Sequence, residues 1–212
     1  MNIQNSNNFN NFTPQFGALH VASSGNLNLY RLNDSADFKF IKSLQEKVDL
    51  ESLMPGLTKD KYSRWKEMIE YAKDNALKPE NVTYVETCDN KICGIITYTP
   101  DKTTKLDCIC TWPVEKNQKV ACGGKLLFLQ LFKDFAEYKG TRIKLDAITN
   151  GPFDVIKKYM QLGFQRTTEE HPTKVKMEIN KYKINEVMNY LQNLLHYTTE
   201  QPSKINLQNF DI

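Results

Sequence analysis

The chain has 212 residues, of which 40% are hydrophobic and 25% are charged, and its formal net charge is +3. This length suits one well-buried domain and is short for two. The charge is too small to predict a nucleic-acid-binding surface, which needs many clustered Lys and Arg residues. No apolar run reaches the roughly 18 residues of a membrane helix, and residues 1–11 lack the basic start and apolar stretch of a signal peptide. We expect a cytoplasmic protein that binds neither nucleic acid nor a membrane.

The two ends of the chain differ from its middle. Residues 1–25 begin with an asparagine-rich stretch that contains few apolar side chains. Such a segment buries too little apolar surface to offset its ordering entropy, so we expect a flexible arm over residues 1–25. A similar tail is expected from residue 198 onward. One domain should occupy residues 26–182, and residues 183–212 should form an amphipathic C-terminal helix followed by the tail.

Apolar residues recur at period two or 3.6 through the middle of the chain, which predicts alternating strands and helices. Strands are expected at 27–32, 82–88, 91–99, 105–111, 142–149, 164–167 and 173–179. Helices are expected at 35–50, 59–76, 123–138, 152–162 and 183–197. Asp89 and Asn90 predict a hairpin turn, and Gly140 is expected to cap the helix before it. This order predicts an α/β (α+β) fold, with a mixed central sheet of about six to seven strands flanked by helices and an appended C-terminal helix.

The chain has five cysteines, and an odd number argues against a disulfide framework. Cys108 and Cys110 stand two apart in a predicted strand, so their side chains should lie on one face. Cys88 and Cys93 flank the predicted hairpin turn. Neither pair has the C-x2-C spacing of a zinc knuckle. We therefore expect buried thiols and no metal, with a four-cysteine zinc site as the less favoured alternative.

A predicted strand runs through a loop of small residues into an apolar helix. The strand ends with Ile109, Cys110 and Thr111, and the loop contains Gln118, Lys119, Val120, Ala121, Cys122, Gly123 and Gly124. Small side chains let a ligand approach the backbone, and the first N–H groups of a helix have no partner within it. Together with the helix dipole, these groups predict a site for a phosphate or pyrophosphate. An ordinary strand–helix turn remains the alternative.

The pattern Gln118-x-x-Ala121-x-Gly123 resembles the Gln/Arg-x-x-Gly-x-Gly/Ala signature of the GNAT superfamily of acetyl-CoA-dependent N-acetyltransferases. The segment from Tyr159 to Phe164 matches that family's Tyr-x-x-x-Gly-Phe segment, and residues 145–150 resemble its fifth strand. Three features depart from the family: Ala121 replaces the first Gly, and the stretches from Pro113 to Gln118 and from Asn150 to Tyr159 are both longer. Asn150 either contacts the cofactor, as in the family, or caps the following helix.

The resemblance implies the GNAT fold and direct transfer of the acetyl group of acetyl-CoA to a primary amine. Backbone groups of Ile109, Cys110 and Thr111 would hold the pantetheine arm. The loop residues Gln118 to Gly124 would hold the pyrophosphate, and a backbone N–H near Cys110 or Thr111 would donate to the oxyanion. The Tyr159 hydroxyl would act as general acid at the sulfur. The attacking amine must lose a proton, and the candidate bases are Asp107, Asp146 and Glu86.

The acceptor amine, either a small molecule or a protein amine, is not identified by any motif. Residues 33–80 and the C-terminal helix are expected to select it. The alternative is a catalytically degenerate CoA-binding or protein-interaction module on the same fold, which the Ala121 replacement and the longer loops would suit. The sequence is compatible with a homodimer and does not determine the oligomeric state.

Overall fold

The protein is described by a computed structural model that covers residues 17–33, 37, 39–42, 44, 48–116, 124–149, 151, 153–168, 171–205 and 207. The strands in chain order are β1 (Ala18–Ser24), β2 (Leu27–Arg31), β3 (Val82–Cys88), β4 (Lys91–Thr99), β5 (Thr103–Thr111), β6 (Arg142–Ile148), β7 (Gln165–Arg166), β8 (Lys174–Asn180) and β9 (Thr198–Ile205). The helices are α2 (Leu50–Leu53), α3 (Lys59–Ala76), α4 (Lys125–Glu137), α5 (Val155–Gln161) and α6 (Lys181–Leu195). Residue 37 and the described residues between 39 and 44 are also helical.

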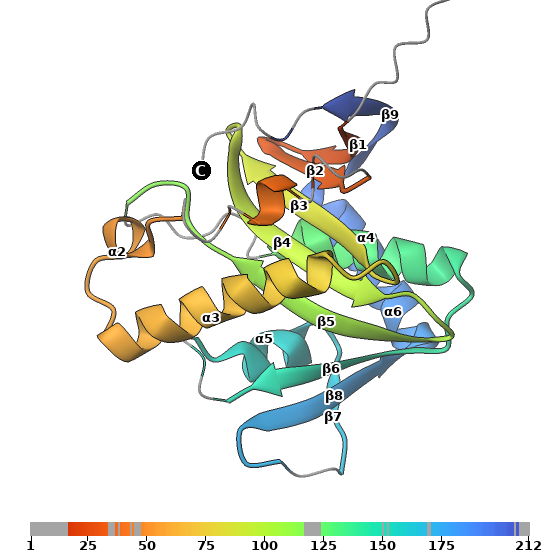
Figure 1. Ribbon diagram of the computed structural model, residues 1–212. Coiled ribbons are helices and arrows are strands. Elements are labelled where there is room, and N and C mark those ends of the chain that lie inside the picture. Colours follow the sequence, from red (N-terminus) through yellow and green to blue (C-terminus); the bar gives the residue numbers. More distant parts are fainter. Residues whose placement is uncertain are drawn as a thin grey trace, which may run out of the picture.

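Within the described ranges, nine strands form one sheet in the order β7-β8-β6-β5-β4-β3-β2-β1-β9 (Figure 1). Every neighbouring pair is antiparallel except β5 and β6, which run parallel. Helices flank the sheet, and α6 follows β8, which is the last strand that the sequence predicts. The predicted fold class is therefore confirmed.

The predictions are most accurate in the middle of the chain. The observed bounds of α3, β3 and β4 equal the predicted ones. The turn between β3 and β4 has positive φ at both central residues, 50° at Asp89 and 62° at Asn90. This is the backbone of a type I′ turn, whose twist matches that of the strands it joins.

The prediction of flexible ends is wrong for residues 18–24 and 198–205. Strand β1 pairs with β2 on one side and with β9 on the other, so both ends of the described chain belong to the same sheet. Ala18 and Ala22 of β1 are completely buried. Small side chains leave only a weak hydrophobic pattern in the sequence, whereas the backbone hydrogen bonds of β1 are made along both edges. The asparagine-rich residues 1–16 lie outside the described part.

The end of α4 also differs from the prediction. Lys139, and not Gly140, takes the left-handed position after the helix, with a φ of 53°. Gly140 is required for another reason: a Cβ there would lie 2.1 Å from the Phe135 ring. The glycine thus allows the ring to pack directly on the backbone.

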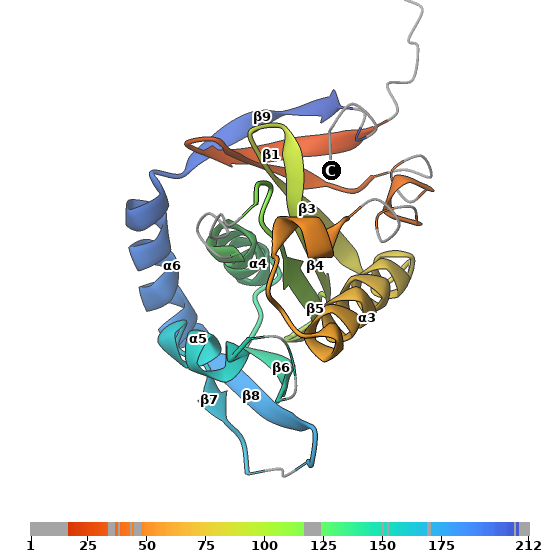
Figure 2. The ribbon, with the colours of Figure 1, turned by 90° about the vertical axis from the view of Figure 1, so that its left-hand side faces the viewer.

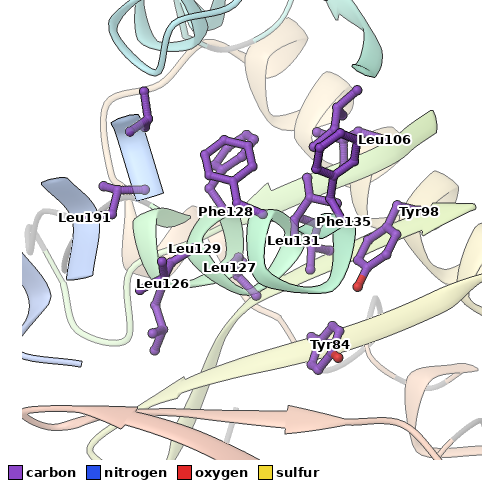
Figure 3. Packing of buried hydrophobic residues seen from close by; sticks show 14 of the residues in the cluster. Tyr84, Tyr98, Leu106, Leu126, Leu127, Phe128, Leu129, Leu131, Phe135 and Leu191 are labelled. Atoms are coloured by element: carbon purple, nitrogen blue, oxygen red, sulfur yellow. The ribbon is translucent and has the colours of Figure 1, made fainter. Parts of the chain in front are cut away.

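Helices α4 and α6 cover one face of the sheet, and α3 covers the other (Figure 2). Helix α4 is buried on most of its surface because it lies between the sheet and α6, as the close view of its leucine and phenylalanine side chains shows (Figure 3). Helix α5 packs on the same side as α4, since Val155 and Tyr159 contact that core. In the described part, no helix is long and apolar enough to span a membrane.

A polar cluster lies inside the core beneath the C-terminal half of α4. Asp134 is buried and accepts hydrogen bonds from the hydroxyls of Tyr84 (2.7 Å) and Tyr98 and from Gln130 Nε2 (2.7 Å). Burial and the nearby carboxylate raise the pKa of the Tyr84 hydroxyl well above its ordinary value, so it remains a donor. Tyr197, just after α6, donates to Gln130 Oε1 at 3.1 Å. The cluster links α4 to β3, β4 and the end of α6.

Replacement of Asp134 by Ala should strongly destabilise the fold. Two buried tyrosine hydroxyls would lose their acceptor, and each buried group left without a partner costs about 1–3 kcal/mol. We expect the free energy of unfolding, measured with urea, to fall by roughly 3–5 kcal/mol. The matched control is Glu137→Ala on the same helix, where the side chain is exposed. Equal losses in the two variants would contradict a stabilising role for the cluster.

Candidate active site

Strands β5 and β6 separate partway along their length. They pair only from Thr103 with Arg142 to Leu106 with Leu145. Beyond that point, β5 continues to pair with β4, and β6 continues to pair with β8. Residues 107–111 of β5 therefore present one edge that has no strand partner within the described residues.

A β-bulge lies at the point of separation. Tyr98 pairs with Leu106, but the preceding Thr97 pairs with Cys108, so Asp107 is an extra residue in β5. Bulges bend a strand and change the direction of its side chains. Here Leu106 belongs to the core on the α4 side, whereas Cys108 and Cys110 belong to the core on the α3 side. The prediction that the two cysteines share a face is confirmed.

A cavity of about 540 Å³ lies where the strands separate. Its size is within the range of about 300–1,000 Å³ that is usual for small-molecule sites. It is lined by Arg64, Glu67, Met68, Tyr71, Leu106, Asp107, Cys108, Ile109, Leu145, Asp146, Ile148, Gly151, Phe153, Val155, Tyr159, Thr173 and Lys174. Helix α3 lies on one face of the sheet and α5 on the other, and both contribute to this lining. The cavity therefore passes through the sheet between β5 and β6.

Tyr159 is held by aromatic packing at the α5 side of the cavity. Its ring centroid lies 5.9 Å from that of Phe128 and 6.0 Å from that of Phe164. Its hydroxyl has no hydrogen-bond partner among the described residues. Burial, with a smaller effect of the Cys108 and Cys110 thiols, raises the pKa of this hydroxyl well above its ordinary value. Tyr159 therefore keeps its proton at neutral pH and is a hydrogen-bond donor toward the cavity.

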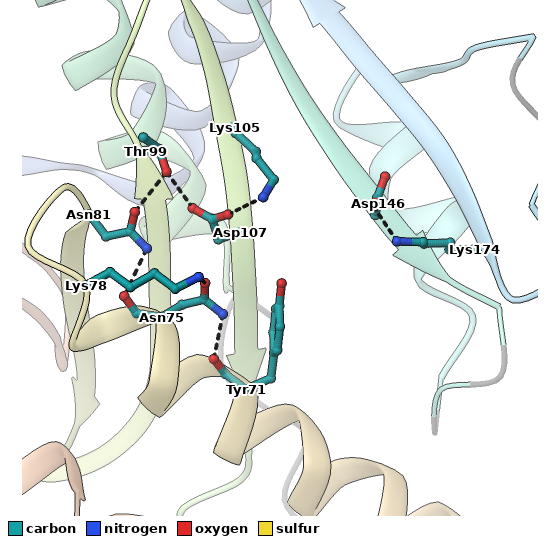
Figure 4. A network of polar contacts seen from close by, with 9 residues as sticks. All are labelled: Tyr71, Asn75, Lys78, Asn81, Thr99, Lys105, Asp107, Asp146 and Lys174. Carbon is teal, nitrogen blue, oxygen red and sulfur yellow. Dashed lines mark hydrogen bonds and ion pairs between the residues drawn. The ribbon is translucent and has the colours of Figure 1, made fainter.

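Asp107 and Asp146 line the cavity from the two separated strands (Figure 4). The Asp107 side chain is only 3% exposed, lies 2.8 Å from Lys105 Nζ and accepts a 2.9 Å hydrogen bond from Thr99 Oγ1. Asp146 is more exposed and pairs with Lys174 at 2.9 Å. The two candidate bases are thus at the same cavity, with Asp107 in the more protected position.

The third candidate base, Glu86, has a different environment. It is completely buried in β3, and both carboxyl oxygens lack a hydrogen-bond partner among the described residues. A Cβ at Gly94, the residue opposite, would lie 3.1 Å from Glu86 Oε2, so the carboxyl fills space that only a glycine leaves. Burial raises the pKa of Glu86 from its ordinary value of 4.5 to about 8. Glu86 is not among the residues that line the cavity.

The beginning of α4 adjoins the unpaired part of β5. Gly124, the residue before the helix, has a φ of 78°, and a Cβ there would lie 3.2 Å from Ile109 Cδ1 and 3.3 Å from Thr111 Cγ2. Only glycine combines that φ with such close packing at low cost. Because Ile109 also lines the cavity, the helix N-terminus and the cavity are neighbours. Gln118, Lys119, Val120, Ala121, Cys122, Gly123 and Asn150 lie outside the described residues, so their cofactor-binding roles stay predictions.

Four cysteines fall within the described residues, and Cys88, Cys93, Cys108 and Cys110 are free and buried. Most side chains of the α3 wall of the cavity are not identified from the sequence, beyond the general expectation that residues 33–80 select the acceptor. Arg64, Glu67 and Tyr71 recur at helical spacing and mark one stripe of α3, which is the signal that could have found them. Phe153, in the loop before α5, has no comparable signal.

The solved structures most similar to this fold include acetyltransferases. A proposed acetyltransferase from T. thermophilus is 13% identical with a TM-score of 0.55, over 83% of this chain and 97% of its own. A protein of unassigned function from Bacillus halodurans is 11% identical with a TM-score of 0.59, over 84% and 97%. FdhC, a nucleotide-linked sugar GNAT, is 14% identical with a TM-score of 0.51, over 85% and 99%. No protein-family model and no curated protein matches the sequence. At these identities the likeness shows a GNAT-type fold.

The titration of Glu86 should make stability depend on pH. Between pH 4.5 and about 8, the folded protein keeps a proton on Glu86 that the unfolded chain has released. Protonation of Glu86 in the folded state therefore contributes fully to stability below pH 4.5, and this contribution is lost as the pH rises through about 8. Glu86→Gln cannot titrate at this position. The free energy of unfolding of this variant, relative to that of wild type, should therefore increase by a few kcal/mol between about pH 5 and about pH 9.

Urea unfolding at both pH values measures this difference, and Glu137→Gln, at an exposed position, is the control. A constant difference between wild type and Glu86→Gln across this range would show that Glu86 does not take up a proton on folding.

Proposed function

We propose that the protein is an acetyl-CoA-dependent N-acetyltransferase that acts on a primary amine. The observation that carries the proposal is the cavity that passes through the sheet where β5 and β6 separate. The cavity is lined by α5 on one face of the sheet and by α3 on the other, so two ligands could meet in it from opposite faces. In this proposal, the thioester of acetyl-CoA and the acceptor amine meet in the cavity near Asp107 and Tyr159. The GNAT-type fold supports the same reaction class.

The described residues fit coenzyme A on the α4 side. The unpaired edge of β5 at residues 109–111 offers backbone groups to the amides of a pantetheine arm, as an added strand would use them. The N-terminus of α4 offers N–H groups and a partial positive charge to the pyrophosphate. Gly124 allows the start of α4 to pack directly on Ile109 and Thr111 of β5, because it has no side chain. Residues 118–123 would complete the anion site as the family resemblance implies.

Asp107 and Tyr159 would move the protons. When bound, acetyl-CoA supplies the acetyl group as a thioester, whose carbon–sulfur bond breaks as the nitrogen–carbon bond to the acceptor forms. Asp107 would accept the proton that the amine loses, and the Tyr159 hydroxyl would donate a proton to the sulfur. Asp107 is preferred over Asp146 because it is the more protected of the two from water. Glu86 is the least favoured base, since it does not line the cavity.

One observation favours the alternative of a CoA-binding module without transfer. Both candidate bases at the cavity are paired with lysines, Asp107 with Lys105 and Asp146 with Lys174. Each lysine occupies part of the hydrogen-bonding capacity of its carboxylate, which an attacking amine would also need. Coenzyme A binding without turnover of any amine would support this alternative.

Removal of the Tyr159 hydroxyl should reduce turnover without loss of cofactor binding. Tyr159→Phe keeps the ring packing and removes only the proton donor, so kcat should fall by about a hundredfold or more. Calorimetry with coenzyme A should give a Kd close to that of wild type. Tyr182→Phe, whose ring is exposed on α6, is the control. Wild-type turnover in a folded Tyr159→Phe protein would exclude Tyr159 as the acid, and absence of coenzyme A binding by wild type would exclude the proposed function.

The base can be assigned by a pair of isosteric changes. Asp107→Asn removes the proton acceptor and should reduce kcat/KM by about a hundredfold, whereas Asp146→Asn should have a much smaller effect. Thermal unfolding of both variants checks that the fold is kept. If Asp146→Asn is the inactive variant, the base is Asp146 and the role given to Asp107 is wrong.

A further inference from the structure

Large exposed apolar side chains gather at the rim of the cavity. Tyr71 is 50% exposed, Ile148 39% and Phe153 38%. They come from α3, the end of β6 and the loop before α5, and all three line the same cavity. Phe153 is held edge-on against the buried Trp65, with ring centroids 5.5 Å apart. Exposed apolar surface that converges on one cavity from three elements indicates a binding surface for an apolar ligand group.

The charged groups of the cavity are balanced. Arg64 pairs with Glu67 at 2.7 Å, and Lys174 pairs with Asp146 at 2.9 Å. Asp107 pairs with Lys105 at 2.8 Å. Among the described lining residues, each ionic side chain thus has an opposite charge beside it. A polycation would need several unpaired carboxylates, and a phosphate or carboxylate group on the acceptor would need an unpaired cation.

We infer that the acceptor is a small monoamine with an aromatic or branched apolar body. Its amine would lie toward Asp107, and its body would lie against Tyr71, Ile148 and Phe153. The Asp107 carboxylate can accept further hydrogen bonds beyond those from Lys105 and Thr99, because each of its oxygens has two acceptor positions. The inference rests on the proposed acetyl transfer and names the substrate class of that site.

Size limits the acceptor further. The cavity of about 540 Å³ must hold the thioester end of the donor as well as the acceptor. Figure 4 shows Asp107 with Lys105 and Tyr71 on one side and Asp146 with Lys174 on the other, and Tyr71, Asp107, Asp146 and Lys174 all line the cavity. This arrangement favours a compact acceptor with one charge over a polyamine or an amino acid.

The test compares four acceptors at saturating acetyl-CoA, with thiol release as the readout. Phenethylamine has the proposed body, ethanolamine lacks it, phenylalanine adds a carboxylate, and spermidine adds charges. We expect kcat/KM for phenethylamine to exceed each of the others by at least about tenfold. Preference for ethanolamine, phenylalanine or spermidine would overturn the inference.

A variant at the rim separates this inference from the proposed function. Phe153→Ser should weaken the apparent affinity for phenethylamine, measured as KM, by about tenfold, since the apolar contact is lost. Met160→Ser on α5 is the matched control, because Met160 is also apolar and exposed but does not line the cavity. Ligand-observed NMR of phenethylamine with each variant measures binding without turnover.

The outcomes are distinguishable. If the NMR signal of bound phenethylamine is lost with Phe153→Ser but kept with Met160→Ser, the proposed acceptor class is supported. Equal signals in both variants would overturn it even if wild type binds coenzyme A and acetylates another amine, in which case the proposed function stands. If wild type fails to bind coenzyme A in calorimetry, the proposed function and the acceptor class both fail.

Discussion

Strands β5 and β6 are held together by four residue pairs, the last of which joins Leu106 to Leu145. Backbone groups beyond this pair must find other partners, and a ligand that binds as an extra strand can supply them. The bulge at Asp107 determines what surrounds the opening. In a regular strand, Leu106 and Cys108 would lie on the same face of the sheet. Because of the extra residue, Leu106 lies in the core on the α4 side and Cys108 in the core on the α3 side. Asp107 therefore lies where the two cores and the cavity meet, and the proposed chemistry depends on that position.

Two buried carboxyl groups on the same face of the sheet have opposite environments. Asp134, beneath the C-terminal half of α4, accepts hydrogen bonds from three donors. Glu86 lies near Leu127, in the first turns of the same helix, and has no donor among the described residues. One end of α4 is thus fixed by a satisfied polar cluster, whereas Glu86, near the other end, has no donor among the described residues.

The sequence predicts elements well where local signals and tertiary structure agree. Asp89 and Asn90 favour the positive φ values of a type I′ turn, so the bounds of β3 and β4 are found correctly. Strands β1 and β9 are missed because their pairing joins the two ends of the described chain, such as Ala18 with Ile205, and no local pattern encodes it. Tyr159, Asp107 and Asp146 are proposed from family resemblance and residue chemistry, and they meet at one cavity. The bulge at Asp107 and the rim residue Phe153 follow only from the packed structure.

For the proposed acetyl transfer, the cavity lining favours α3 over the C-terminal helix as the region that would contact the acceptor. The sequence predicts that both regions take part, but α6 packs against α4 and β8, and none of its residues lines the cavity. Its apolar stripe of Ile184, Val187, Leu191 and Leu195 is buried in the core. After α6, the chain returns to the far edge of the sheet and pairs as β9 with β1. The C-terminal region therefore stabilises the sheet and covers α4, while the stripe of α3 that carries Arg64, Glu67 and Tyr71 lines the cavity. Changes in acceptor preference should accordingly come from α3 and the loop before α5, whereas changes in α6 should alter stability.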